Sequence, residues 1–261
     1  MRRWLPLGLT LVILLALSPP VRAQAAVFNV DSNQGSVQVI LEELRPVGLK
    51  VLVEKDNTRY FYNLNRRQER FPLQMGAGKY RVHVLEHTEG NKYKFVQSEE
   101  FDLLSAVLEN SFLGSIQNIP WEEAPQVVAK ARELTQQTNL AGEKLKEIYS
   151  FVIDNVRYDH KKAERLPTEY LPNPEETLLT GQGICYDYAS LFASMLRSVG
   201  VPTKLVMGTA EGVPDYHAWN EVYVDGEWLI IDTTVDAKLK QADKPFSMVK
   251  GEKAYRATRV Y

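Results

Sequence analysis

A β-hairpin is predicted by the stretch DYHAWNEVYVDGEWLIID, which occupies residues 215–232. Apolar and polar side chains alternate on both sides of Asp225-Gly226, as they do in strands that bury one face. Asp-Gly is a preferred two-residue connection between antiparallel strands, so the turn sets Val224 opposite Glu227. The stretch therefore predicts an antiparallel sheet in the second half of the chain.

The same register brings two titratable side chains together. Continued away from the turn, it places Trp219 opposite Asp232 and His217 opposite Thr234. His217 and Asp232 are then diagonal neighbours on one face, with their Cβ atoms roughly 7 Å apart or less. A carboxylate at that distance can accept a hydrogen bond from an imidazole N–H and hold the ring in one tautomer.

Cys185 is the only cysteine of the chain, and it stands at the predicted start of a helix. Gly200 and Pro202 close this helix. Apolar residues with helical spacing follow the cysteine: Tyr188, Leu191, Phe192, Met195, Leu196 and Val199. The unpaired N–H groups of a helix start favour a thiolate and can hold an oxyanion. A lone cysteine, strand histidine or terminal aspartate is commonly structural. Together, we interpret Cys185, His217 and Asp232 as nucleophile, base and orienting carboxylate.

Three blocks between residues 118 and 236 resemble the transglutaminase-like superfamily, which shares the papain-like fold of cysteine enzymes. They are GICY at 183–186, LRSVGVPTK at 196–204, and HAWNE at 217–221 with WLIID at 228–232. The resemblance implies the same three roles for Cys185, His217 and Asp232. It also implies an α+β core in which N-terminal helices pack on an antiparallel sheet. Calcium-binding carboxylate clusters, which animal transglutaminases carry, are not evident in the sequence.

The apolar periodicity predicts two further helices, around residues 125–134 and 145–156. We expect a long irregular stretch from Arg157 to Gly183, because it contains three prolines. The oxyanion-hole glutamine of papain lies six residues before the cysteine, where this chain has Leu179. Gln182 could replace it or form a turn. Tyr158, at the predicted end of a helix, could supply a hydroxyl or be a buried aromatic.

The first half of the chain reads as short strands separated by turn residues. Alternating β-branched and aromatic residues occupy 37–41, 49–53, 59–62, 80–84 and 93–96. Strands of this length and spacing predict a small all-β, sandwich-like domain over 27–103. A linker is then expected over 104–120 and the catalytic domain over 121–261.

One motif in the predicted sandwich resembles a metal site. His83 to His87 spell H-x-x-E-H, the zinc-binding pattern of inverted zincins, which requires a helix. In a strand, residues four apart are separated by about 13 Å and cannot share an ion. We therefore expect a solvent-facing strand pair, with no metal and no cofactor.

The N-terminus resembles a secretory signal peptide over residues 1–25. Two arginines precede an apolar run at 5–17, and small residues follow. That run is shorter than the roughly 20 residues needed to cross a bilayer, so we expect export to the cell envelope or exterior without stable membrane insertion. Removal of Arg2, Arg3 and Arg22 would change the formal net charge from −2 to about −5. An acidic surface argues against nucleic acid as a partner.

These expectations describe an exported, cysteine-dependent acyl-transfer enzyme that acts on amide groups of a protein or peptide through a thioester. An amine acceptor would make it a cross-linking enzyme, whereas water would make it a peptidase or amidase. A non-enzymatic envelope-binding protein is the third alternative. The sequence gives neither the substrate nor the oligomeric state.

Overall fold

The protein is described by a computed structural model over residues 26–43, 48–104, 108–167 and 169–261. The predicted signal peptide, residues 1–25, lies outside the described residues. Within them, no helix combines the length and the apolar character needed to cross a membrane.

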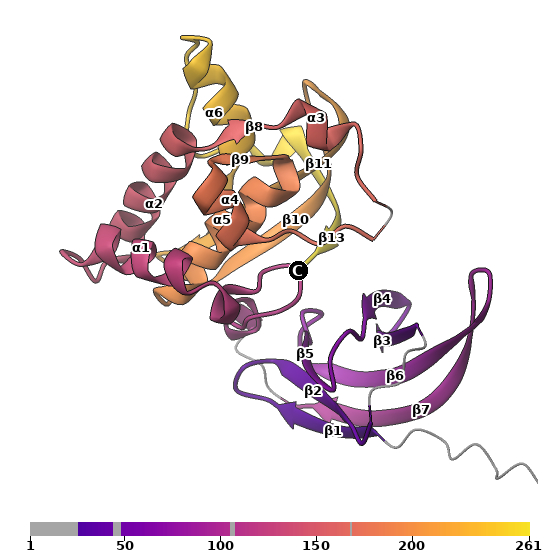
Figure 1. Ribbon diagram of the computed structural model, residues 1–261. Coiled ribbons are helices and arrows are strands. Elements are labelled where there is room, and N and C mark those ends of the chain that lie inside the picture. The colour runs from indigo at the N-terminus through magenta and orange to yellow at the C-terminus, as the bar shows by residue number, and fades with distance from the viewer. Residues whose placement is uncertain (1–25, 44–47, 105–107, 168) are drawn as a thin grey trace, which may run out of the picture.

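Two antiparallel sheets pack face to face in the N-terminal part (Figure 1). One has the strand order β1-β2-β5 and the other β4-β3-β6-β7. Their bounds are β1 (Ala26–Asp31), β2 (Ser36–Leu41), β3 (Leu49–Lys55), β4 (Thr58–Asn63), β5 (Gln68–Pro72), β6 (Gly78–Glu89) and β7 (Lys92–Leu103). Inward-facing side chains such as Val39 of β2 and Val51 and Val82 of the larger sheet form one core. The predicted sandwich is confirmed, with β1 and β5 as strands that the sequence pattern did not predict.

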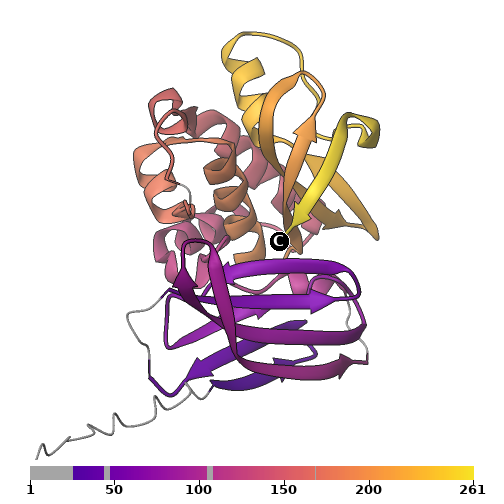
Figure 2. The ribbon, with the colours of Figure 1, turned by 90° about the vertical axis from the view of Figure 1, so that its right-hand side faces the viewer.

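A four-stranded antiparallel sheet organises the C-terminal part, with the order β12-β11-β10-β13. Its strands are β10 (Thr203–Ala210), β11 (Val213–Val224), β12 (Glu227–Ile231) and β13 (Tyr255–Val260). The helices that cover it are α1 (Pro125–Thr135), α2 (Ala141–Asn155), α5 (Cys185–Ser198) and α6 (Thr233–Gln241). Figure 2 shows the helices gathered on one side of the strands. The predicted α+β core is confirmed.

Buried apolar residues join these helices to the sheet. One core contains fully buried residues from both layers: Ile148 and Val152 of α2, Phe192 and Met195 of α5, and Val222 of β11. Each fully buried side chain of this size contributes roughly 1.5–3 kcal/mol to folding. Because the apolar side chains of α5 pack in this core, they fix the position of the first residue of the helix, Cys185.

The stretch before α5 is more regular than its prolines predicted. It contains β8 (Arg157–Tyr158), α3 (His160–Ala163), α4 (Pro174–Thr180) and β9 (Gln182–Gly183). The expectation of an irregular segment is therefore wrong for these residues. Asn173 caps α4 by accepting the Glu176 N–H at 3.1 Å, and Pro174 takes the first helical position, which proline favours.

The C-terminal strand connects the two parts of the molecule. The ring of Tyr261 packs edge-on against Tyr60 and Tyr62 of β4, with centroids 5.8 and 6.1 Å away. Beside it, Arg259 donates from Nη1 to the carbonyl oxygen of Arg59 at 2.6 Å. The backbone N–H of Val260 donates to the Tyr60 hydroxyl at 3.3 Å. The sandwich therefore packs on β13, the edge strand of the C-terminal sheet. The described part of the chain also contains three short 3-10 helices, η1 (Leu108–Phe112), η2 (Trp121–Glu123) and η3 (Glu252–Ala254).

Candidate active site

The hairpin has the predicted register, but its second strand is shorter than predicted. β11 and β12 pair with Asn220 opposite Ile231 and Val224 opposite Glu227. The strand ends at Ile231, and Asp232 is the N-cap of α6.

The pairings expected beyond Ile231, Trp219 with Asp232 and His217 with Thr234, are therefore wrong. The Asp232 carboxylate accepts the Val235 N–H at 3.0 Å, which turns the chain into a helix before Thr234 can pair.

His217 and Asp232 nevertheless meet. Nε2 of His217 lies 2.8 Å from Oδ2 of Asp232. The two side chains are 4% and 0% exposed, so water does not compete for this hydrogen bond. Because an ionised carboxylate can only accept, Nε2 carries the hydrogen and Nδ1 is the nitrogen left for another partner.

Cys185 lies beside this ring. It is half-buried at the first position of α5, and its proximity to His217 helps to raise the pKa of the imidazole. Burial lowers the pKa of His217, but the hydrogen bond with Asp232 and the negative charges of Asp232 and Cys185 outweigh this effect and raise the pKa to about 9. The structure therefore brings together all three residues that the sequence singled out.

The start of α5 is held by a buried carboxylate. Asp187 is fully buried and accepts the Ile184 N–H at 2.9 Å, which secures the residue before the nucleophile. It also pairs with Lys162 Nζ at 2.9 Å and accepts from the Tyr170 hydroxyl. A Cβ on Gly183 would lie 2.6 Å from the Asp187 Cβ, so this arrangement needs glycine there. The segment between α3 and α4 is thereby tied beside the nucleophile.

Asp232 has one more partner, from a distant strand. Tyr255 of β13 donates its hydroxyl to Oδ2 of Asp232 at 3.0 Å. Trp219 stands between the two rings involved, stacked on His217 with centroids 6.3 Å apart and edge-on to Tyr255 at 5.0 Å. The imidazole is therefore fixed by ring packing as well as by the carboxylate.

Comparison with known proteins finds a family match in the part of the chain that carries these residues. Residues 128–233 match the family model described as the transglutaminase-like superfamily. This part of the chain is therefore similar to that superfamily. The human protein named Kyphoscoliosis peptidase is 29% identical over 127 residues, which are 42% of this chain and 19% of that protein. The chain spans between 17% and 34% of the length of the curated relatives that it matches.

Solved structures with similar folds include two bacterial proteins. A candidate cysteine protease from Cytophaga hutchinsonii has a TM-score of 0.43 and 17% identity, over 76% of this chain and 71% of that one. The periplasmic domain of TgpA from Pseudomonas aeruginosa has a TM-score of 0.41 and 16% identity, over 81% of this chain and 91% of that one.

The sequence singled out two oxyanion candidates, Gln182 and Tyr158. Gln182 of β9 is exposed and pairs through its backbone with Arg157. Tyr158 lies in β8 opposite Gly183, and not at the end of a helix as expected, because α2 ends at Asn155. Burial first, and then the negative charge of Cys185, raise the pKa of Tyr158. Both oxyanion roles stay predictions.

The H-x-x-E-H motif lies in strand β6, as predicted. His87 is exposed, but His83 is only 7% exposed and its Nδ1 lies 2.6 Å from Ser98 Oγ. The expectation of a solvent-facing pair is therefore wrong for His83, because β7 covers it. Among the described residues, no three His, Cys, Asp or Glu side chains gather as metal ligands would.

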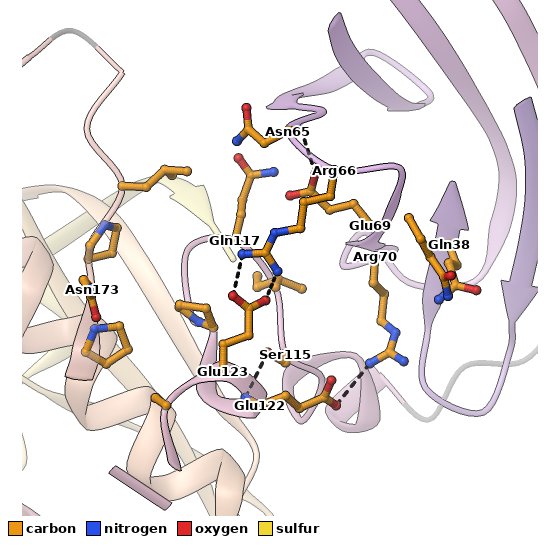
Figure 3. A pocket seen from close by; sticks show the side chains of 17 residues that line it. Gln38, Asn65, Arg66, Glu69, Arg70, Ser115, Gln117, Glu122, Glu123 and Asn173 are labelled. Atoms are coloured by element: carbon orange, nitrogen blue, oxygen red, sulfur yellow. Dashed lines mark hydrogen bonds and ion pairs between the residues drawn. The ribbon is translucent and has the colours of Figure 1, made fainter. Parts of the chain in front are cut away.

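A polar cavity of about 590 Å³ lies between the two parts of the molecule (Figure 3). It is crossed by ion pairs of Arg66 with Glu123 and of Arg70 with Glu122, the latter at 3.3 Å. The three candidate catalytic residues do not line it. Its exposed ion pairs contribute at most about 1 kcal/mol each, so the cavity wall is weakly held.

Proposed function

We propose that the transglutaminase-like part of this chain is a cysteine-dependent acyl-transfer enzyme acting on amide groups of proteins or peptides. Cys185 is the nucleophile, His217 the general acid and base, and Asp232 the orienting carboxylate. The observation that carries the proposal is the buried 2.8 Å hydrogen bond of His217 with Asp232, made by a ring whose pKa Asp232 and Cys185 together raise. A pKa of about 9 keeps this ring protonated at neutral pH, which supports a thiolate–imidazolium pair.

The reaction follows from that pair. The Cys185 thiolate adds to the amide carbonyl carbon, and the carbonyl oxygen takes up the negative charge. N–H groups in the first turn of α5 lack intrahelical acceptors and can stabilise this oxyanion. The C–N bond then breaks as His217 gives its Nδ1 proton to the departing nitrogen, which leaves as an amine or ammonia. A thioester on Cys185 remains.

The second half-reaction decides the product. An acceptor attacks the thioester carbon while His217 removes its proton, and the C–S bond breaks to restore the thiolate. An amine acceptor gives a cross-link, and water gives hydrolysis. Hydrolysis is the second candidate, and it is favoured by the human relative's being named a peptidase. A protein that only binds the envelope would not need the buried hydrogen-bonded pair.

The wider organisation is part of the proposal. We place an export signal at residues 1–25, the sandwich domain at 27–103, a linker at 104–120 and the catalytic domain at 121–261. The enzyme would act outside the cytoplasm on a protein or peptide substrate, without nucleic acid and without stable membrane insertion.

Product analysis by mass spectrometry tests the function. The protein, lacking residues 1–25, is incubated with a protein rich in glutamine and lysine and with a labelled primary amine. Cys185→Ala removes the nucleophile, and Ser198→Ala, at the far end of the same helix, is the matched control. Amine incorporation or cross-links lost only in Cys185→Ala support amine transfer, whereas cysteine-dependent cleavage or deamidation supports hydrolysis. Equal products from Cys185→Ala and the unmodified protein would contradict the proposal.

A further inference from the structure

We propose that Tyr255 is a positioning residue of the triad, whose hydroxyl keeps the Asp232 carboxylate turned toward His217. This inference rests on the proposed function, because it assigns Tyr255 a role in the same site. Tyr255 touches neither Cys185 nor a substrate, so it acts only through the carboxylate.

The first argument is the number of donors that Asp232 receives. Its Oδ2 accepts both from Nε2 of His217 at 2.8 Å and from the hydroxyl of Tyr255 at 3.0 Å. Its Oδ1 accepts the backbone N–H of Val235 at 3.0 Å. The Asp232 side chain is 0% exposed, so water cannot replace a lost donor. The bond from His217 belongs to the triad, and the bond from Val235 caps α6. The bond from Tyr255 serves neither purpose, so it is left to orient the carboxylate.

The second argument concerns charge. Burial makes a carboxylate hold its proton, and donors to the ionised form counteract this effect. A protonated Asp232 would no longer stabilise an imidazolium on His217. The phenol of Tyr255 makes a charge-assisted bond, which is among the stronger hydrogen bonds of a protein. Its own pKa is raised by burial and by the nearby Asp232, so it stays a donor throughout the neutral range.

The third argument is that the backbone is built to bring Tyr255 there. β13 pairs with β10, with Tyr255 opposite Ala210, and the register shifts by one residue next to Gly208. A Cβ on Gly208 would lie 2.0 Å from the carbonyl oxygen of Arg256 and 3.0 Å from the Trp219 ring. Glycine at 208 thus allows β13 and Trp219 to approach closely, which seats the Tyr255 ring on Trp219. The ring is held by packing, independently of its hydroxyl.

Other titratable groups also lie around Asp232. They are His217 and, beyond it, Cys185; Asp236 of α6 with its partner Lys250; and Tyr149 of α2. Tyr149 gives a matched control, because it donates its hydroxyl to Asp236 at 2.7 Å, four residues further along the chain. Tyr149→Phe and Tyr255→Phe each remove one phenol–carboxylate bond, but only the second bond belongs to Asp232.

The test is a pH titration of the His217 imidazole by NMR, in parallel with the rate at which iodoacetamide alkylates Cys185 near neutral pH. In Tyr255→Phe we expect the titration midpoint of His217 to fall by about one pH unit and the alkylation to slow, because a carboxylate that is free to turn stabilises the imidazolium less. In Tyr149→Phe both should stay where they are in the unmodified protein. In an Asp232→Asn background, Tyr255→Phe should cause no further change in alkylation.

An unchanged midpoint in Tyr255→Phe, or an equal change in Tyr149→Phe, would overturn the proposal. Tyr255→Met, which also lacks a donor, carries the same expectation if the phenylalanine variant does not fold. Neither measurement requires turnover, so a protein that failed the product analysis could still show the shift. The failure of this inference is therefore distinguishable from the failure of the proposed function.

Discussion

Raising the pH should destabilise this protein through one residue, His217. Its pKa is about 9 in the fold, against an ordinary value of 6.5. Because the folded value is the higher one, the stabilisation is complete below about pH 6.5 and is lost as the pH rises through about 9. The difference corresponds to about 3 kcal/mol. Since domains of this kind have total stabilities of about 5–15 kcal/mol, this is a large share.

The assay is urea unfolding, followed by circular dichroism at a series of pH values from about 6 to about 10. His217→Gln removes the titrating ring, and Asp232→Asn removes the main charge that raises its pKa. Both variants should have a lower free energy of unfolding near neutral pH. Both should also lose about 3 kcal/mol less than the unmodified protein over this range.

Parallel curves for the unmodified protein and His217→Gln would refute the reasoning. They would mean that the imidazole is not protonated in the fold and that Asp232 and Cys185 do not favour its charged form. A fall in the opposite direction, with stability lost toward acid in that range, would contradict the sign of the linkage.

Three further outcomes are expected. Iodoacetamide should modify Cys185 roughly tenfold faster in the native protein than in His217→Ala, and equal rates would contradict an activated thiol. Gly208→Ala should lower the free energy of unfolding by about 3 kcal/mol, because the added Cβ would lie 2.0 Å from the backbone carbonyl oxygen of Arg256. Gly251→Ala is the control and should change it by less than about 0.5 kcal/mol, because a Cβ there would meet open space. Arg197→Leu should cost at least about 2 kcal/mol, because its buried guanidinium binds three backbone carbonyls; a neutral effect on thermal unfolding would count against this.

The sequence predicted the hairpin register because a two-residue turn leaves little freedom. It did not predict where the second strand ends, since alternation continues through Asp232 while helix capping begins there. Strand pairing and N-capping compete for the same residue, and the cap wins because Val235 offers an N–H at 3.0 Å. The structure still has the contact of His217 with Asp232, because a side chain just beyond the end of a strand can reach its diagonal neighbour.

Tyr255, Lys162 and Tyr170 were outside the reach of sequence patterns. Tyr255 is 23 residues from Asp232, and Tyr170 is 17 residues from Asp187. Each lies in a segment with weak periodicity, where a single polar side chain gives no sign of its partner. The sequence did not predict β1 and β5 for a related reason. β1 is mostly exposed, and β5 begins with polar and charged residues, so neither shows a clear buried face.

The two anions of the proposed triad each lie at the start of a helix. Cys185 opens α5, which has 14 residues, and Asp232 caps α6, which has 9. The positive end of each helix favours negative charge there by roughly 0.3–1 kcal/mol, and by up to about 2 kcal/mol where the site is partly buried. His217 comes from the strand between them and contributes the cation. The ion pair is therefore balanced by two helix starts rather than by water, which is why a nearly fully buried imidazole can keep its proton at neutral pH.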